Sequence, residues 1–287
     1  MKTLQLSKII AGTMTWGKWG KKFSSQHIAD LQNYYVGKGI TSFDHADIYG
    51  DYTTEADFGK GFAESGIARE KVQFITKCGI QMVCENRDFA VKHYDYSKEH
   101  IIESVHNSLK NLQTDYIDVL LLHRPSPLMH PGVIAEAIQD LKEANKVLHF
   151  GVSNFTPSQV AMLSKYISVE INQIEFSLTH HEAMLNGSLD QMIENDIVPM
   201  AWSPLGNYFT KKYPSLKHAL KITASKYKTT EDTVLLAWIL KHPAGILPVI
   251  GTTQKERINK ALEALEINLS LEDWFYILQI ATGNPVA

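Results

Sequence analysis

Cysteine is almost absent from this sequence, which has only Cys78 and Cys84 among its 287 residues. Two cysteines cannot form a disulfide framework for a chain of this length, and their separation of six positions does not match a zinc-binding motif. We therefore expect no disulfide, no metal and a reducing, cytoplasmic environment.

Long apolar runs and an excess of one charge are also lacking. No stretch approaches the roughly 18 apolar residues that a transmembrane helix needs. The first eight residues, interrupted by Gln5, Ser7 and Lys8, are not a convincing signal peptide. A formal net charge of −3 leaves no basic surface typical of nucleic-acid binding. We therefore expect neither a membrane nor a nucleic acid as a partner.

Short apolar strands alternate with amphipathic helices along the whole sequence. Strands are expected at residues 7–12, 41–44, 72–77, 116–122, 148–152, 169–172, 197–201 and 246–250. Helices are expected at 26–38, 54–64, 98–111, 132–144, 188–195, 216–227, 231–241 and 253–264, with another opening at Thr156 and an extra one at Ser270. Thr156, Ser188 and Thr253 each have Gln or Glu three positions later, which predicts capping boxes.

Eight strand-then-helix units predict one α/β fold. Repeated units of this kind give parallel strands with right-handed crossovers, and eight of them close into a (β/α)8 TIM barrel. No composition shift or proline-rich linker divides the chain, so we expect one domain over residues 1–287 with an extra C-terminal helix. An open doubly wound sheet is the alternative, but residues 12–17 lack the G-x-G-x-x-G spacing that it would carry after its first strand.

Polar residues stand where the predicted strands end, and a barrel has its active site there. Asp44, Lys77 and His123 end the second, third and fourth strands, and Tyr49 lies in the loop after the second. Taken singly, each has an ordinary explanation, such as a turn cap or a solvated charge. Taken together, they predict proton transfer, because a nearby ammonium lowers the pKa of a phenol and makes it a better acid.

Seven ordered motifs carry a resemblance to a known family. They are Phe-Asp-His-Ala-Asp-Ile-Tyr-Gly at 43–50, Ile-Thr-Lys at 75–77, Leu-His-Arg-Pro at 122–125, Gly-Val-Ser-Asn-Phe at 151–155, Asn-Gln-Ile-Glu-Phe at 172–176, Trp-Ser-Pro-Leu at 202–205 and Val-Ile-Gly-Thr-Thr at 249–253. On these motifs the sequence resembles the aldo-keto reductase superfamily over nearly its whole length. Residues 47–50, Arg124 and the short C-terminus resemble a bacterial oxidoreductase branch of it.

The resemblance implies an NADPH-dependent oxidoreductase that reduces aldehydes or ketones to alcohols. In this chemistry the nicotinamide gives a hydride to the carbonyl carbon and Tyr49 gives a proton to the oxygen. Lys77, held by Asp44, would make the tyrosine more acidic, and His123 would donate a hydrogen bond to the carbonyl oxygen. The expected partner is a small carbonyl compound, and the expected assembly is a monomer or a weak homo-oligomer.

The same resemblance implies a set of cofactor-binding residues. Ser153, Asn154 and Gln173 would surround the nicotinamide carboxamide, and Trp202 would stack on the ring where most relatives have tyrosine. The pyrophosphate would be lined by Ser203, Leu205 and Gly206, and the adenosine phosphate by Gly251, Thr252, Thr253 and Arg257. Some relatives have a lysine at Gly251, and an acidic residue and an asparagine at Lys260 and Ala261. Arg257 could pair with a 2′-phosphate, although alone it would be a solvated helix charge.

A substrate pocket is expected among aromatic loops at the same end of the barrel. Trp16, Trp19, Tyr52, Arg124 and Tyr208 lie in these loops. Aromatic walls suit apolar or aromatic carbonyl compounds. Arg124 would either receive a carboxylate or have a structural role.

Two other functions remain open at this point. Lys77 could form a Schiff base, as in barrel aldolases, although pairing with a carboxylate would keep it protonated and make it a poor nucleophile. The chain could also bind NADPH as a sensor or regulatory barrel with little turnover.

Overall fold

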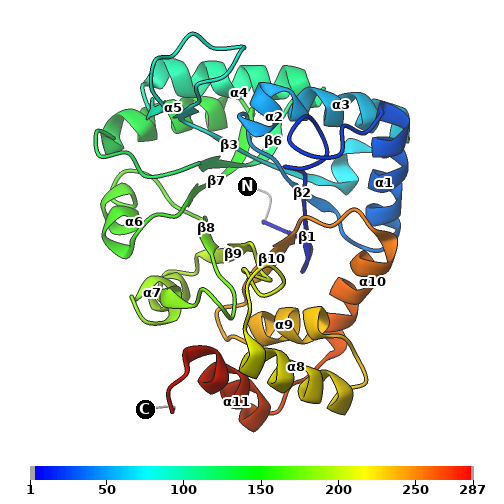
Figure 1. Ribbon diagram of the computed structural model, residues 1–287. Coiled ribbons are helices and arrows are strands. Elements are labelled where there is room, and N and C mark those ends of the chain that lie inside the picture. Colours follow the sequence, from blue (N-terminus) through cyan, green and yellow to red (C-terminus); the bar gives the residue numbers. More distant parts are fainter. Residues whose placement is uncertain (1–3, 286–287) are drawn as a thin grey trace. The chain divides into compact units, whose positions relative to one another are not determined.

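The computed structural model describes residues 4–285, and eight of the strands in this range form a closed barrel (Figure 1). Around the barrel the strands follow one another in chain order, and the registered pairs are parallel. They are β1 (Ile10–Gly12), β2 (Ser42–Asp44), β3 (Gln73–Cys78), β6 (Ile117–Leu122), β7 (Val147–Ser153), β8 (Ile171–Glu175), β9 (Val198–Trp202) and β10 (Leu247–Ile250). The predicted TIM barrel is confirmed.

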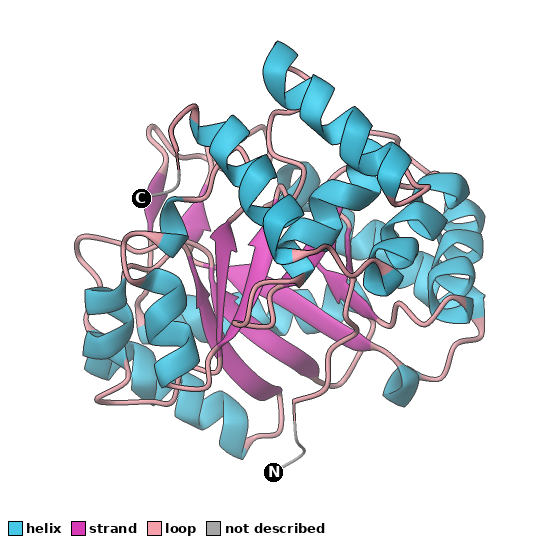
Figure 2. Cartoon of the chain, turned by 90° about the horizontal axis from the view of Figure 1, so that it is seen from below, coloured by secondary structure: helices cyan, strands magenta, loops and turns pink. Residues whose placement is uncertain are grey.

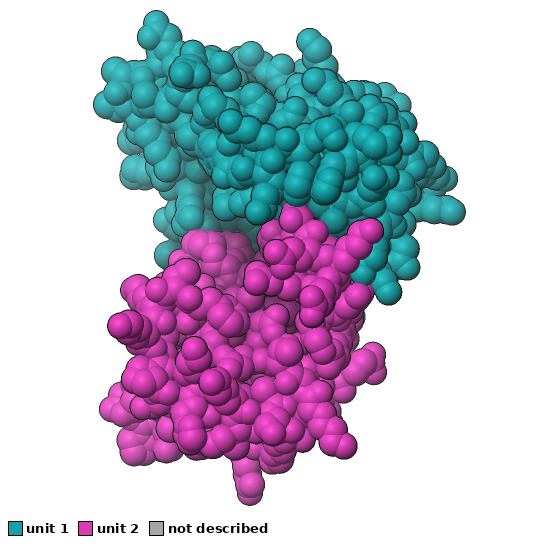
Figure 3. Space-filling model, turned by 45° about the vertical axis from the view of Figure 1, so that its right-hand side comes forward, with its two compact units in different colours: residues 1–173 teal, residues 174–287 magenta. Residues whose placement is uncertain are grey.

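The chain divides into two compact units, one ending at Gln173 and the other beginning at Ile174 (Figure 3). The first unit holds β1 to β7 and the first three residues of β8, and the second unit holds β9 and β10. The single domain expected over residues 1–287 stays a prediction.

Helices connect the strands, as Figure 2 shows. The first unit has α1 (Ser25–Gly37), α3 (Thr54–Ser65), α4 (Lys98–Leu112), α5 (Pro131–Glu143) and α6 (Pro157–Leu163). The second has α7 (Ser188–Glu194), α8 (Pro214–Lys226), α9 (Glu231–Leu240), α10 (Lys255–Glu263) and the extra α11 (Leu271–Thr282). Each was predicted from its apolar periodicity and end signals. Within residues 4–285, none of the helices combines the length and apolar character needed to cross a membrane.

Two of the three predicted capping boxes are wrong. Thr156 forms the predicted box with Gln159. Helix α7, however, is preceded by Gly187 in a left-handed conformation, with no side-chain cap. Helix α10 begins two residues later than expected and also lacks a side-chain cap. In the turn before it, the Thr252 hydroxyl accepts the Gln254 N–H. At both α7 and α10, the conformation of the preceding turn, and not a side-chain cap, determines where the helix begins.

Several short elements were not predicted. Directly after β2 comes α2 (Tyr49–Tyr52), which contains non-helical residues. A two-stranded antiparallel hairpin, β4 (Ile80–Gln81) with β5 (His93–Tyr94), follows β3. Three 3-10 turns are η1 (Arg69–Lys71), η2 (Glu182–Met184) and η3 (Ala264–Glu266). These segments are too short for a periodic pattern to reveal them.

Candidate active site

Lys77 lies at the centre of a buried polar cluster in the first unit. Its Nζ donates to both carboxylate oxygens of Asp44 at 2.8 Å and to the carbonyl of His45 at 2.7 Å. Burial works to lower the pKa of Lys77, but the Asp44 carboxylate and the Tyr49 hydroxyl outweigh it, and the net pKa is raised. Lys77 is therefore a charged ammonium at neutral pH.

Tyr49 is the third residue that accepts a hydrogen bond from this ammonium, with its hydroxyl 3.3 Å from Nζ. Tyr49 is the first residue of the short helix α2, which follows β2. Because β2 pairs with β3, the phenol lies near the end of β3. Burial raises the pKa of Tyr49 above its ordinary value, and the charge of Lys77 offsets only part of that rise. Tyr49 is therefore fully protonated at neutral pH, although the sequence had suggested a net increase in acidity.

His123 faces Tyr49 edge to face, with the ring centroids 6.1 Å apart. Burial lowers the pKa of His123 well below its ordinary value, and the Lys77 charge adds to this effect. The imidazole is therefore neutral at pH 7. Its Nδ1 atom is buried and has no hydrogen-bond partner among the described residues.

The ends of β7 and β8 are tied to the same cluster. Gln173 donates from Nε2 to Asp44 at 2.9 Å, and its main-chain carbonyl accepts from the Ser153 hydroxyl at 3.0 Å. Asn154 donates from Nδ2 to Ser153 at 2.7 Å and from its main chain to the Gln173 carbonyl at 2.8 Å. Three of the predicted cofactor residues are thus brought together with Asp44. The link between Gln173 and Asp44 was not foreseen.

In the second unit, the residues predicted at the pyrophosphate form a tight turn after β9. The Gly206 N–H donates to the Ser203 carbonyl at 2.7 Å, and both residues have positive φ. A Cβ at Gly206 would lie 2.1 Å from the Thr179 hydroxyl, so no larger residue fits without movement. Trp202 and Leu205 are partly exposed beside this turn.

The residues predicted at the adenosine phosphate follow β10. Gly251 and Arg257 are exposed, and Thr252 and Thr253 are partly exposed. Arg257 stands on the first turn of α10, and the segment before it has no regular structure. This segment is open to solvent, as a phosphate-binding loop must be.

Trp16 does not line a pocket. Its side chain is fully buried and packs against Tyr35, Phe43 and Phe58, with ring centroids 5.8 to 6.3 Å apart. The assignment of Trp16 to the substrate pocket is therefore corrected: it belongs to the aromatic core of the first unit. A tryptophan in a loop and one in a core cannot be distinguished from the sequence alone.

Trp19 is the predicted pocket residue that lies next to the cluster, with its ring centroid 6.1 Å from that of Tyr49. Tyr52 is partly exposed, and its hydroxyl donates to the Ile80 carbonyl at 3.2 Å. The main chain of Arg124 is held by the hydroxyl of Tyr96.

Tyr208, the remaining predicted pocket residue, belongs to the second unit and is buried. Its hydroxyl donates to the Glu231 carboxylate. It lines a cavity of about 370 Å³, whose other lining residues are Phe209, Lys211, Lys212, Tyr213, Pro214, Lys217 and Glu231.

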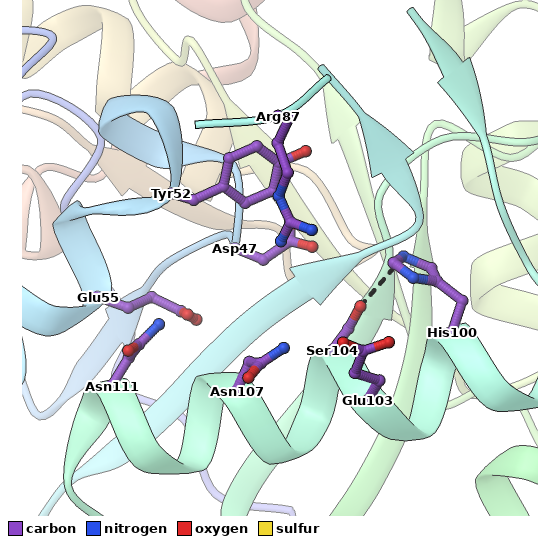
Figure 4. Close-up of a pocket in the computed structure, with 9 residues that line it drawn as sticks. All are labelled: Asp47, Tyr52, Glu55, Arg87, His100, Glu103, Ser104, Asn107 and Asn111. Atoms are coloured by element: carbon purple, nitrogen blue, oxygen red, sulfur yellow. Dashed lines mark hydrogen bonds between the residues drawn. The ribbon is translucent and has the colours of Figure 1, made fainter. Parts of the chain in front are cut away.

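A polar cavity of about 230 Å³ in the first unit was also not foreseen (Figure 4). Its walls are Asp47, Tyr52, Glu55, Arg87, His100, Glu103, Ser104, Asn107 and Asn111. Burial raises the pKa of both Asp47 and Glu55, and the mutual repulsion of the two carboxylates adds to the rise at Asp47. None of the four proton-transfer groups lines this cavity, so we do not assign the reaction to it.

Comparison with known proteins identifies the family. Residues 8–282 match the model of the Aldo/keto reductase family. The chain belongs to the aldo/keto reductase family. Family members use nicotinamide cofactors and act on small carbonyl substrates, which supports carbonyl reduction in general.

Three similar proteins illustrate the relationship. YcsN, an uncharacterized oxidoreductase of Bacillus subtilis, is 43% identical, with 99% of this chain and 97% of that protein covered. A 6-dehydroglucose reductase of Agrobacterium fabrum is 38% identical, with the same coverage. The crystal structure of an aldo/keto reductase from Klebsiella pneumoniae in complex with NADP and acetate aligns with a TM-score of 0.80 at 23% identity, covering 98% of this chain and 93% of that chain, and shares the fold.

Proposed function

We propose that this protein is an NADPH-dependent reductase of aldehyde and ketone carbonyls, with Tyr49 as the proton donor. The observation that carries the proposal is the position of the Lys77 ammonium, 3.3 Å from the Tyr49 hydroxyl and 2.8 Å from the Asp44 carboxylate. A protonated phenol backed by a fixed positive charge is suited to give up its proton as negative charge develops on a substrate oxygen.

The residues present fit a nicotinamide cofactor. A carboxamide needs both donors and acceptors, and the side chains of Ser153, Asn154 and Gln173, gathered at the ends of β7 and β8, supply both. Ser203 is exposed and Leu205 and Gly206 are partly exposed, so a pyrophosphate can reach this turn. We assign Ser153, Asn154 and Gln173 to the carboxamide, Trp202 to the ring, and Ser203, Leu205 and Gly206 to the pyrophosphate.

Preference for NADPH over NADH rests on the loop after β10. We assign Gly251, Thr252, Thr253 and Arg257 to the adenosine and its 2′-phosphate. The exposed guanidinium of Arg257 can pair with a phosphate through two hydrogen bonds.

The reduced nicotinamide supplies the hydride when it is bound. Residues of the chain donate the proton, stabilise charge and orient the substrate. Tyr49 donates its phenolic proton to the carbonyl oxygen, and Lys77 stabilises the phenolate left behind. Asp44 keeps Lys77 charged and fixes its Nζ atom. His123 is neutral, and a proton on Nε2, with the unpartnered Nδ1 as the bare nitrogen, allows it to donate to the carbonyl oxygen.

The two other functions are less well supported. A Schiff base requires a neutral amine, but the raised pKa of Lys77 keeps that amine protonated. A sensor without turnover would not need Tyr49 and His123 to face each other beside a buried ammonium. The protein is expected in the cytoplasm, an environment that suits the free thiols of Cys78 and Cys84. Its expected assembly is a monomer or weak homo-oligomer.

The test is a fluorescence titration with NADPH and NADH, followed by a turnover screen with aldehydes, ketones and diones. An aldehydic sugar belongs in the panel because of the 6-dehydroglucose reductase among the relatives. We expect tighter binding of NADPH and measurable oxidation of it with at least one carbonyl compound. A protein that binds neither nucleotide would refute the proposal.

A further inference from the structure

We propose that Asp51 is a positioning residue that holds the Trp19 indole against Tyr49 and so preforms one wall of the substrate pocket. This inference rests on the proposed function, because it concerns how a substrate would bind beside the proton donor. All the residues that carry it lie in the first unit.

The Asp51 carboxylate binds two residues of the loop after β1 at once. Its Oδ1 accepts from the Trp19 indole nitrogen at 2.9 Å, and its Oδ2 lies 2.7 Å from the Lys18 ammonium. Lys18 and Trp19 are neighbours in sequence, so the two bonds fix both the position of the loop and the direction of the indole. The indole in turn packs on Tyr49 at a tilt of 56°.

The backbone around Asp51 has an unusual conformation, which sets the direction of the Asp51 side chain. Gly50, Asp51 and Tyr52 have φ angles of 62°, 57° and 68°, three successive residues in the left-handed region. Glycine accepts this conformation readily and aspartate at moderate cost, but a bulky tyrosine does not. Such strain persists only where the surroundings impose it, and it is typical of functional sites.

Contacts between Tyr52 and the hairpin after β3 impose this left-handed conformation. The Tyr52 hydroxyl donates to the Ile80 carbonyl and accepts from the Met82 N–H at 3.0 Å, so the ring is anchored to the hairpin after β3. The Arg87 guanidinium lies 4.5 Å from the ring centroid, and Figure 4 shows the two side chains against each other. Asn86 also donates to the Asp51 carbonyl at 3.0 Å. The hairpin thus holds the left-handed run, and the run directs Asp51 toward Trp19.

The loop that Asp51 holds is a compact turn. The Lys21 N–H donates to the Thr15 carbonyl at 2.7 Å, and the Phe23 N–H donates to the Trp16 carbonyl at 3.0 Å. The Trp19 side chain at its tip is 37% exposed, and Asp51 is its only hydrogen-bond partner among the described residues. Without this bond the indole could leave Tyr49 while the loop stayed folded.

Because Asp51 already holds the Trp19 indole in place, substrate binding does not have to order this side chain and loses less conformational entropy. Immobilising one free side chain weakens binding by roughly three- to tenfold. Because Tyr49, Lys77 and Asp44 are untouched, loss of Asp51 should act on substrate binding and leave the chemical step unchanged.

The experiment compares two substitutions at this position. Asp51→Gly removes the carboxylate but suits the left-handed backbone, and Asp51→Asn keeps an oxygen for Trp19 while losing the charge. We expect Asp51→Gly to raise KM for an aromatic aldehyde by roughly three- to tenfold, with kcat within about twofold of wild type. Asp51→Asn should restore most of the KM. The control is Lys98→Met, which breaks an ion pair of 2.6 Å on α4 and α5 and should change neither constant.

A second measurement does not depend on turnover. The indole N–H signal of Trp19, assigned in a 15N–1H spectrum with Trp19→Phe, should shift most in Asp51→Gly, which has no acceptor, and less in Asp51→Asn, which keeps a weaker, neutral one. An unmoved signal in Asp51→Gly, an unchanged KM in that variant, or an equal rise of KM in both variants would overturn the inference. Failure of the wild-type protein to turn over any carbonyl would instead count against the proposed function, and the spectrum would still decide the role of Asp51.

Discussion

Lys77 and Asp44 form a buried ion pair in which the ammonium donates to both carboxylate oxygens at 2.8 Å, and neither side chain is more than 4% exposed. Removing one member of such a pair leaves an uncompensated buried charge, which costs about 3–5 kcal/mol. We therefore expect Asp44→Asn to lower the free energy of unfolding by about that amount, measured by urea denaturation. Neutralising both members with Asp44→Asn and Lys77→Met should recover much of the loss. Equal stability of the single variant and wild type would contradict this account.

The hydroxyl of Tyr49 is expected to be indispensable for reduction. Tyr49→Phe keeps the ring that packs on Trp19 and His123 but deletes the proton donor. General acid catalysis contributes roughly 10²- to 10⁴-fold, so kcat should fall at least about a hundredfold while NADPH still binds. Tyr166→Phe, at a 58% exposed position, is the matched control and should have no effect. Turnover near the wild-type level in Tyr49→Phe would remove that residue from the acid role.

The pH dependence of reduction follows from the same two groups. A proton donor works while it is protonated, so activity is lost as pH rises through its pKa. Burial raises the pKa of Tyr49 above its ordinary value near 10, and therefore no alkaline loss of kcat from this group is expected below about pH 10. Burial lowers the pKa of His123 well below 6.5, so this imidazole gains a charge only in acid. A profile of kcat against pH should be flat through neutrality, and a descending limb between pH 7 and 8 would contradict the assignment.

The sequence predicted the barrel because eight apolar strand patterns alternate with helical ones, and parallel strands must bring their carboxyl ends to one rim. That rule alone places Asp44 beside Lys77, since β2 and β3 pair directly. It does not predict the contact between Gln173 and Asp44, which joins residues 129 positions apart through packed side chains. It also does not give the net direction of the Tyr49 pKa, which depends on how far burial outweighs the Lys77 charge.

Other features escaped prediction for local reasons. The left-handed run at Gly50, Asp51 and Tyr52 is imposed by contacts with a hairpin that has no periodic pattern. Trp16 and Trp19 occupy the same loop, yet one is buried in an aromatic core and the other packs on Tyr49. Which of two nearby tryptophans turns inward is decided by the space left between α1, α3 and β2, and that space is a property of the folded chain.

Acid stability should depend on Glu170. Burial opposes its ionisation, but hydrogen bonds from His149 and Lys142 prevail and lower the pKa of Glu170 to about 2. A carboxylate whose pKa is lowered by folding stabilises the protein above its unfolded pKa, and this contribution is lost as pH falls toward the folded value. Because Glu170 is only half-buried, solvent screens part of this effect, so Glu170→Gln should cost about 1–2 kcal/mol at pH 7. The difference from wild type should shrink between pH 4.5 and about 2. A cost that is independent of pH over this range would show that the loss is one of packing.

In the second unit, Trp238 and Trp274 stack with centroids 4.8 Å apart and exchange hydrogen bonds from each indole nitrogen to the other's carbonyl, at 3.2 and 2.9 Å. These contacts attach α11 to α9. Trp274→Phe keeps a stacked ring but leaves the Trp238 carbonyl without that donor, which should cost about 1–3 kcal/mol. Thermal unfolding measures the loss, and Tyr276→Phe on the same helix, at a 41% exposed position, is the control expected within about 0.5 kcal/mol of wild type. Equal melting temperatures for the two variants would mean that stacking alone holds the helix, because only the Trp274 variant removes a donor from the reciprocal pair.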